Sequence, residues 1–320
     1  MIFLNTVFLG SGGFSRDLLD ELLRSGFEIS AVFTRPDHPA GRGLHRRPTP
    51  VKAFAKLRGL RVFQPDGPRD PLFTASLGEV KPELMLVADY GYLLPARILG
   101  YTAKGCLNVH PSLLPRYRGA APIQRALMRG EAVTGVSLMV MDEGMDTGDV
   151  IAVRELAIAD SDSALTLRRK LATLGAGLLL ETLPPFLAGD IPPVPQDEAM
   201  ATYADPIRKE DTVIDWTRTA ADIHNQVRAL SPRPGAYTLL RGKRVKVLRT
   251  LPRPDVAAGI PGELLPEGKE GVAVGTGGGA LQLLEVQPEG KKAMSAGEFR
   301  RGYRPARGEV FLAPGEAGTN

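Results

Sequence analysis

The chain is poor in the residues that build disulfides and metal clusters. Its 320 residues include one cysteine, Cys106, four histidines and one tryptophan. A single cysteine excludes an internal disulfide and a cysteine-ligated metal cluster, which fits a reducing compartment. The chain also lacks a run of about 18 or more apolar residues and begins without a basic, cleavable leader. These absences predict a cytoplasmic protein without a membrane span or a bound metal.

Length and charge predict two domains of different character. A chain of 320 residues exceeds what one hydrophobic core usually holds, and 43% hydrophobic with 24% charged residues is ordinary for a globular protein. The excess of positive charge is C-terminal, because residues 207–320 hold 18 Lys or Arg against 13 Asp or Glu. We expect a first domain at residues 1–189, a linker at 190–206 and a second domain at 207–315.

The first domain alternates short apolar runs with helical patterns. The runs are rich in β-branched and leucine residues, and the segments between them carry apolar residues at helical spacing. This alternation predicts an α/β fold with a Rossmann-like, open parallel sheet covered by helices. The expected strands are residues 6–9, 29–33, 84–88, 107–110 and 136–141, and the expected helices are residues 17–23 and 165–187.

The second domain lacks the alternation of strands and helices that marks the first. The linker before it contains Pro192, Pro193 and Pro195, which predict an extended, semi-rigid spacer. Residues 219–230 then predict one amphipathic helix, and short strands separated by glycine and proline turns predict a small, OB-like β-barrel. The expected strands are residues 245–248, 272–274 and 281–286.

Two polar side chains stand at the end of the strand at residues 107–110. Alternation along a strand directs Asn108 and His110 to one face. The carboxyl ends of strands are where open α/β sheets have their ligand crevices. Asp146 follows 36 residues after His110 in an acidic loop between two glycines. If this loop folds over the strand end, the Asp146 carboxylate can hydrogen-bond the imidazole of His110.

An amide donor, an imidazole and a carboxylate suit attack by a neutral nucleophile on a carbonyl. Donors stabilise the oxyanion, and a positioned histidine helps the attacking atom lose its proton. The set therefore indicates acyl or formyl transfer, although a lone strand histidine is more often structural. Cys106 lies four residues before His110, about 13 Å along a strand, so we expect a core residue and no nucleophile.

The residues around this strand end resemble a known family. Residues 108–115, Asn-Val-His-Pro-Ser-Leu-Leu-Pro, and residues 118–126 look like the signature of the methionyl-tRNA formyltransferases, enzymes that use 10-formyltetrahydrofolate. Asp146 falls where that family has its catalytic Asp. Further similar segments are residues 41–43, 88–95, 232–237 and 288–294. The chain departs at residues 10–13, Gly-Ser-Gly-Gly, where a Gly-Thr-Pro turn is more common, and at Asp89, where a small apolar residue is.

The resemblance implies transfer of the formyl group of 10-formyltetrahydrofolate to the α-amino group of methionyl initiator tRNA, for translation initiation. Asn108, His110 and Asp146 would be catalytic, the folate would bind beside the strand ends, and the protein would act as a monomer away from membranes. An amino-sugar nucleotide is the alternative formyl acceptor. The residues expected to contact the folate are Ala88, Tyr90, Gly91, Leu93, Ser112, Leu113, Leu114, Pro115 and Asp142.

Two basic segments are candidates for tRNA contact. Residues 241–253 hold six Lys or Arg and no acid, typical of a surface that tracks phosphates, although a solvated strand face explains the same charges. Residues 35–58 hold seven basic residues against one acid. In the resembled family this loop orders on the acceptor stem. The candidates are Arg42, Arg46, Arg47, Lys243, Arg244, Lys246 and Arg249.

Two rival interpretations come from other classes of protein. Gly10, Gly12 and Gly13 follow a strand and could begin the dinucleotide-binding motif G-x-G-x-x-G, with Arg35 near a ribose phosphate. However, Ser15 stands where this motif requires its last glycine, and no acidic residue ends the second strand. An RNA-binding protein with an inert sheet domain would bind tRNA without needing folate. Folate dependence separates it from a transferase.

Overall fold

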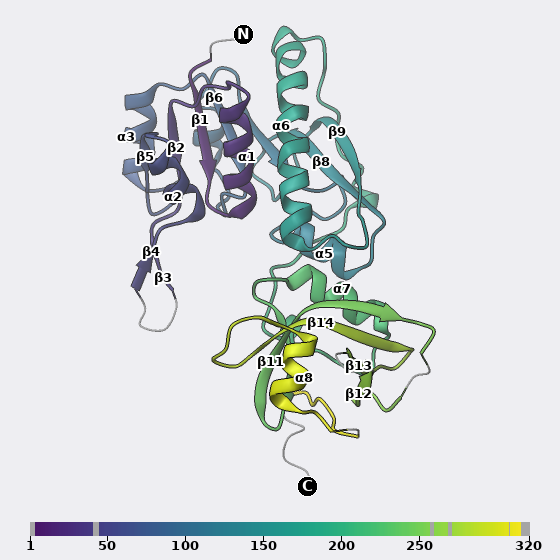
Figure 1. Cartoon of the computed structure of the whole chain (residues 1–320). Helices are drawn as coiled ribbons and strands as arrows, with labels where there is room; N and C mark the ends of the chain where they lie inside the picture. The colour runs from purple at the N-terminus through teal and green to yellow at the C-terminus, as the bar shows by residue number, and fades with distance from the viewer. Residues whose placement is uncertain (1–3, 41–44, 257–258, 268–270, 307, 315–320) are drawn as a thin grey trace. The chain divides into compact units, whose positions relative to one another are not determined.

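The computed structural model describes residues 4–40, 45–256, 259–267, 271–306 and 308–314, which form two compact units (Figure 1). The first unit holds residues 1–122, 132–158 and 166–205, and the second holds residues 123–131, 159–165 and 206–320. The segment at residues 190–205 therefore belongs with the sheet of the first unit. Arg42 and residues 41–43 lie outside the described part of the chain.

A seven-stranded sheet forms the centre of the first unit, in the order β5-β2-β1-β6-β7-β8-β9. Its first five strands run parallel, which confirms the expected open α/β fold. These strands are β1 (Thr6–Gly10), β2 (Ala31–Phe33), β5 (Val62–Phe63), β6 (Leu84–Ala88) and β7 (Cys106–His110). Every residue of β1, β6 and β7 is buried, as strands covered on both faces require.

The last two strands reverse direction. β8 (Val133–Val140) pairs antiparallel with β7, and β9 (Val150–Ala157) pairs antiparallel with β8. The expectation that residues 136–141 join a wholly parallel sheet was therefore wrong. The physical reason is the connection after β7, which re-enters the sheet where β7 ends, so that Ser137 stands opposite His110.

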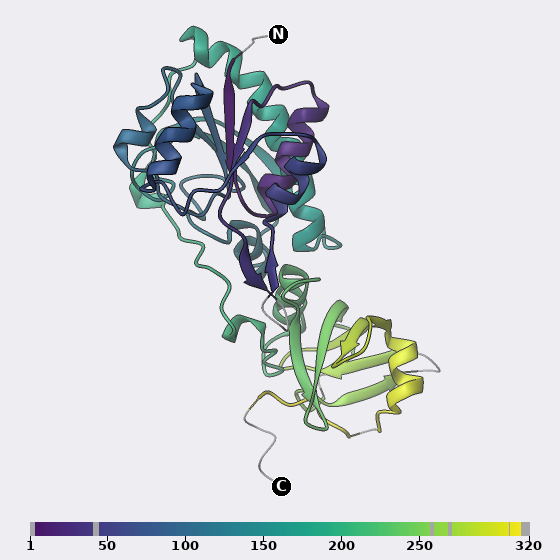
Figure 2. The same ribbon diagram turned by 90° about the vertical axis from the view of Figure 1, so that its left-hand side faces the viewer.

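Helices cover both faces of this sheet (Figure 2). Phe73 and Leu77 of α3 pack with Phe33 and Met85 on one face. On the other face, Gly175 of α6 leaves room for Val109 and Val136, since a Cβ there would lie 2.9 Å from a methyl of Val109. The helices are α1 (Gly13–Arg24), α2 (Pro50–Leu57), α3 (Pro71–Val80), α4 (Ala96–Leu99) and α6 (Ala164–Ala188).

Helix α6 is the expected long closing helix. By length and composition it is apolar enough to cross a membrane, and 44% of its most apolar stretch is buried inside the protein. Leu167 and Leu171 are fully buried, and Arg168 of the same helix binds Asp17 of α1. These contacts make α6 a core helix of the first unit.

The basic segment after β2 folds into a hairpin. β3 (His38–Ala40) and β4 (His45–Arg47) pair antiparallel, with Arg47 opposite His38. Asp37 precedes the hairpin and binds Lys52 of α2 at 2.7 Å, which keeps the pKa of Asp37 below its usual value. Arg46 and Arg47 are exposed.

The second unit is a bent antiparallel sheet in the order β10-β11-β14-β13-β12, with β15 paired to β14. Register shifts between Val247 and Thr250 bend β11. Bridges from Leu312 to Leu239 and from Val310 to Glu263 join the two edges, which gives the expected small barrel. The strands are β10 (Ala236–Leu240), β11 (Lys243–Arg253), β12 (Leu264–Glu267), β13 (Gly271–Gly275), β14 (Ala280–Pro288) and β15 (Met294–Ser295).

The α-helices in the described part of this unit are α5 (Pro122–Met128), whose residues from Ile123 on belong here, α7 (Ala220–Leu230) and α8 (Ala296–Tyr303). Trp216 stacks on Phe311 with ring centroids 5.6 Å apart in the core. Helix α8 was not predicted from the sequence, although Ser295 and Glu298 form a capping box that marks its first turn.

Candidate active site

The three predicted catalytic side chains lie together at the end of β7. Asn108 and His110 are 6% and 5% exposed, and they share one face of the strand as alternation predicts. Asp146 reaches them from the loop between β8 and β9, with a left-handed backbone at φ 57°. A non-glycine residue rarely adopts this conformation, so other contacts must hold the loop in place.

The Asp146 carboxylate is the centre of the cluster. Its Oδ1 accepts a hydrogen bond from Asn108 Nδ2 at 3.2 Å, and its Oδ2 accepts one from the Gly119 amide at 2.8 Å. The distance from Oδ1 to His110 Nδ1 is 3.6 Å. At this distance the expected hydrogen bond between Asp146 and the imidazole is not formed, and Oδ1 accepts its hydrogen bond from the Asn108 amide.

A backbone carbonyl fixes the tautomer of His110. Nε2 of the ring lies 3.0 Å from the carbonyl oxygen of Tyr117, and an oxygen of this kind only accepts. Nε2 therefore carries a hydrogen, and in the neutral ring Nδ1 has the free lone pair that faces the Asp146 side. Tyr117, at φ 60°, was not among the predicted residues, and no local pattern in the sequence marks it.

The Pro-Ser-Leu-Leu-Pro turn, expected to contact folate, is held by its own polar groups. Ser112 Oγ donates to the Arg116 carbonyl at 2.7 Å. Ser137 Oγ of β8 accepts from the Leu114 amide and donates to the Ser112 carbonyl. The Leu113 side chain packs against Gly135, where a Cβ would collide with it. The peptide bond between Leu114 and Pro115 is cis. These bonds set the shape of the turn beside His110.

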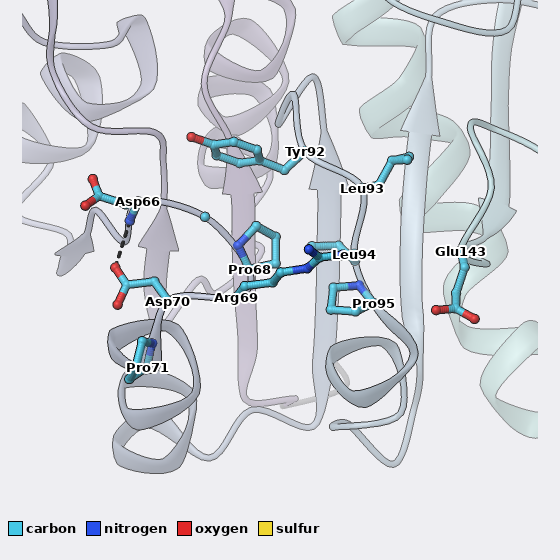
Figure 3. A pocket seen from close by; sticks show the side chains of 11 residues that line it. Asp66, Pro68, Arg69, Asp70, Pro71, Tyr92, Leu93, Leu94, Pro95 and Glu143 are labelled. Carbon is cyan, nitrogen blue, oxygen red and sulfur yellow. Dashed lines mark hydrogen bonds between the residues drawn. The ribbon is translucent and has the colours of Figure 1, made fainter.

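A cavity of about 710 Å³ opens beside the other predicted folate segment (Figure 3). One wall is Tyr92, Leu93, Leu94 and Pro95, and the opposite wall comes from residues 66–71. Glu143, from the loop that also carries Asp146, completes it and accepts a hydrogen bond from the Ala96 amide at 3.1 Å. Leu93 is the one predicted folate residue that lines this cavity.

The other predicted folate residues do not line this cavity. Tyr90 is buried and stacks edge-on against the cavity residue Tyr92, with ring centroids 5.5 Å apart. Gly91 lies against the guanidinium of Arg35, and Ala88 ends β6. The Asp142 carboxylate accepts from the Gly144 amide and from Thr147 Oγ1, which folds the loop that carries Asp146.

The two departures from the resembled family meet in space. A Cβ on Gly12 would lie 1.6 Å from a carboxylate oxygen of Asp89, so only a glycine at position 12 leaves space for that carboxylate. Asp89 has φ 44° and follows β6 directly. Its side chain reaches solvent at the surface, but the protein around it removes part of its hydration, and this desolvation raises its pKa to about 6. The positive charges of Arg35 and Arg168 act in the opposite direction and lower the pKa.

The predicted tRNA-binding residues of the second unit lie on or beside the barrel surface. Val245 and Val247 face the core, whereas Lys243, Arg244 and Arg249 are exposed. Arg244 lies over the ring of Tyr237 at 4.0 Å, and Lys246 Nζ donates to the Pro234 carbonyl at 2.7 Å. Among the described residues, no group of three or more His, Cys, Asp or Glu side chains could hold a metal ion.

Comparison with known proteins identifies the family. Residues 4–183 match the family description "Formyl transferase", and residues 206–304 match "Formyl transferase, C-terminal domain". The chain is 46% identical over 306 residues to a methionyl-tRNA formyltransferase of Carboxydothermus hydrogenoformans, covering 95% of this chain and 98% of that one. It is 44% identical over 305 residues to the same enzyme of Moorella thermoacetica, with the same two coverages. This chain belongs to the methionyl-tRNA formyltransferase family.

Solved structures show the same fold outside the methionyl-tRNA formyltransferase family. HypX from Aquifex aeolicus in complex with tetrahydrofolic acid matches with a TM-score of 0.67 at 22% identity, over 96% of this chain and 48% of that one. The sugar 3N-formyl transferase WlaRD matches with a TM-score of 0.62 at 16% identity, over 91% and 100%. Identities this low show a shared fold and do not identify the molecule that accepts the formyl group.

Proposed function

We propose that this chain transfers the formyl group of 10-formyltetrahydrofolate to the α-amino group of methionyl initiator tRNA. The observation that carries the proposal is the cluster of buried Asn108 and His110 with the half-buried Asp146 at the end of β7, in a chain that belongs to this enzyme family over nearly its whole length. The reaction supplies the formylated initiator for translation, in the cytoplasm and by a monomer.

The cluster suits nucleophilic attack on a formyl carbon. Asn108 Nδ2 donates one of its two hydrogens to Asp146, which leaves the other for the formyl oxygen as negative charge develops there. His110 Nδ1 carries the free lone pair of the neutral ring, so it can take the proton that the attacking amine loses. The ring would then be charged beside the Asp146 carboxylate, 3.6 Å away.

Deprotonating the amine beforehand is a small demand. Free α-amino groups titrate near 7.7 to 8.0, so a fair fraction of the methionyl amine is neutral at pH 7. The protein's main tasks are to hold the amine against the formyl carbon and to move one proton from it to the folate nitrogen that leaves. His110 is the group in this cluster that can carry that proton.

The cavity beside β6 fits the folate. Its volume of about 710 Å³ is in the range of small-molecule pockets, and Tyr92, Leu93 and Leu94 give it an apolar wall. Glu143 links the cavity to the loop of Asp146. We propose that Ala88, Tyr90, Gly91 and Asp142 shape this pocket and that Leu93 contacts the folate directly, with residues 112–115 forming the side toward His110.

The basic surfaces support tRNA as the acceptor. Lys243, Arg244 and Arg249 are exposed on one strand of the barrel, and Arg46 and Arg47 are exposed on the hairpin of the first unit. Exposed cations of this kind bind a phosphate backbone by releasing its counterions. Lys246 and Arg42 complete the proposed set, the latter outside the described residues.

A formyl-transfer assay tests this function. The protein is given 10-formyltetrahydrofolate with methionyl initiator tRNA and, in parallel, with an amino-sugar nucleotide. Transfer to the tRNA alone supports the proposal. Transfer only to the sugar would keep the chemistry of Asn108, His110 and Asp146 and overturn the acceptor, and no transfer to either would overturn the function.

A further inference from the structure

The segment at residues 194–204, which we call the strap, runs along the catalytic cluster. The sequence predicts an extended spacer here. The strap is extended except for one 3-10 turn at Glu198–Met200, and it is hydrogen-bonded to the rest of the first unit. Val194 pairs with Val150 at the start of β9. Thr202 and Ala204 bond to Pro115, Arg118 and Ala121 of the turn that follows β7.

Gln196 of the strap holds the loop of Asp146 by its backbone. Its Nε2 donates to the carbonyl oxygen of Asp146 at 2.9 Å and to that of Gly148 at 2.7 Å. Both hydrogens of the amide are therefore used, one on each side of Thr147. The two bonds fix the backbone that carries the catalytic carboxylate at its unusual φ of 57°.

Arg118 sets the orientation of that amide. Its guanidinium donates to Gln196 Oε1 through Nε at 3.1 Å and through Nη2 at 2.9 Å. A guanidinium has no acceptor atom, so the amide oxygen must face it and the amide nitrogen must face the two carbonyls. Arg118 is fully buried, and the carboxylate of Glu198, also in the strap, balances its charge at 2.7 Å.

The far end of the strap acts on His110 in a comparable way. Thr202 Oγ1 accepts from the Tyr117 amide at 2.9 Å, and the Thr202 carbonyl accepts from the Arg118 amide at 2.9 Å. The carbonyl of Tyr117 is the partner of His110 Nε2. One segment thus hydrogen-bonds the backbone of Asp146 and the backbone of Tyr117, the partner of His110.

We propose that Gln196 is a positioning residue for the formyl transfer and that it sets the Asp146 carboxylate against Asn108 and His110. This inference rests on the proposed function for its kinetic test and on the described contacts for its structural test. Misplacing a reacting group by about 1 Å can cost about 10²-fold in rate. We expect a Gln196 variant to lower kcat and to leave KM for the folate nearly unchanged, because Gln196 does not line the folate cavity.

The test compares variants that remove the two amide hydrogens with a neighbour that leaves them intact. Gln196→Met removes all the bonds at similar size. Gln196→Glu keeps an acceptor oxygen for Arg118. Its second oxygen replaces the donor nitrogen and would repel the carbonyl oxygens of Asp146 and Gly148. Asp197→Ala is the matched control, because the exposed Asp197 carboxylate bonds the Ala199 amide within the strap.

We expect both Gln196 variants to lower kcat about 10- to 100-fold with KM for each substrate within about threefold, and Asp197→Ala to leave both unchanged. A kcat within about twofold of the parent in Gln196→Met would overturn the inference. So would a loss that follows a lower melting temperature and disappears when the assay is cooled, since that is the mark of a structural role.

A second readout does not need activity. The chain has four histidines, so the ring signals of His110 can be assigned in an NMR spectrum by comparison with a His110→Asn variant. Gln196→Met should shift these signals at fixed pH, and Asp197→Ala should not. Unchanged ring signals would overturn the strap inference, whereas a parent protein that formylates nothing would overturn the proposed function and leave this test standing.

Discussion

The predicted functional residues of the two units differ in how much the fold constrains them. Asn108, His110 and Asp146 are held by each other, by Gly119 and by Tyr117 at the end of a buried strand. Lys243, Arg244 and Arg249 project from a barrel strand into solvent. In the first case function depends on geometry within about 1 Å, and in the second on the number of charges. The same kind of substitution should therefore act very differently in the two places.

The largest effect is expected in the buried cluster. His110→Ala removes the proton carrier and should lower kcat about 10²- to 10⁴-fold. Asp146→Asn should act comparably, because both partners of the carboxylate, Asn108 Nδ2 and the Gly119 amide, are donors, and an amide cannot accept from both through its nitrogen. Steady-state and single-turnover rates measure the loss.

Binding separates this outcome from misfolding. Both variants should bind tetrahydrofolate with an affinity close to that of the parent, and Asp149→Asn, an exposed acid in the same loop, should keep full activity. Lost folate binding with intact turnover of bound substrate would show that these residues are ligands of the folate and not catalytic groups.

A smaller effect is expected on the barrel surface. Lys243→Ala, Arg244→Ala or Arg249→Ala should each weaken tRNA binding a few-fold and lower the slope of log K against log salt by about one, with kcat unchanged. Arg241, in the turn before β11, and Arg253, at the end of β11, provide controls, because they pair with Glu309 and Asp255. If the controls weaken tRNA binding as much as the test variants, the charges act as a general basic surface.

The fold was predictable where local pattern decides structure. Short apolar runs predicted β1, β6 and β7, and helical spacing predicted α6 and α7. The direction of β8 was not predictable, since an apolar run looks the same in either direction. The role of Gln196 was also hidden, because its partners Arg118, Asp146 and Gly148 lie 48 to 78 positions away in sequence.

A modest effect on stability is expected at Asp89. Desolvation by the surrounding protein raises its pKa from 3.8 to about 6, so the folded state binds this proton more tightly than the unfolded state does. Its contribution to stability is then fully present below about pH 4 and is lost as the pH rises through about 6. Asp89→Asn should therefore gain stability relative to the parent above pH 6.

The size of that gain is limited by solvent, since the Asp89 side chain is exposed. We expect about 1 kcal/mol or less between pH 5 and pH 8. Urea unfolding at the two pH values measures it. A constant difference between the parent and Asp89→Asn would show that the carboxyl titrates alike in the folded and unfolded chains.

Little effect on activity is expected at Cys106, which shares its strand with the catalytic residues. The thiol is 2% exposed and lies 3.6 Å from the sulfur of Met141. Desolvation raises its pKa above the usual value, so almost no thiolate exists near pH 7. Cys106→Ala should keep kcat within about twofold and cost about 1 kcal/mol of unfolding free energy for the lost packing. A loss of kcat close to that of His110→Ala would mean that a place on this buried strand, and not contact with Asp146, marks the catalytic residues.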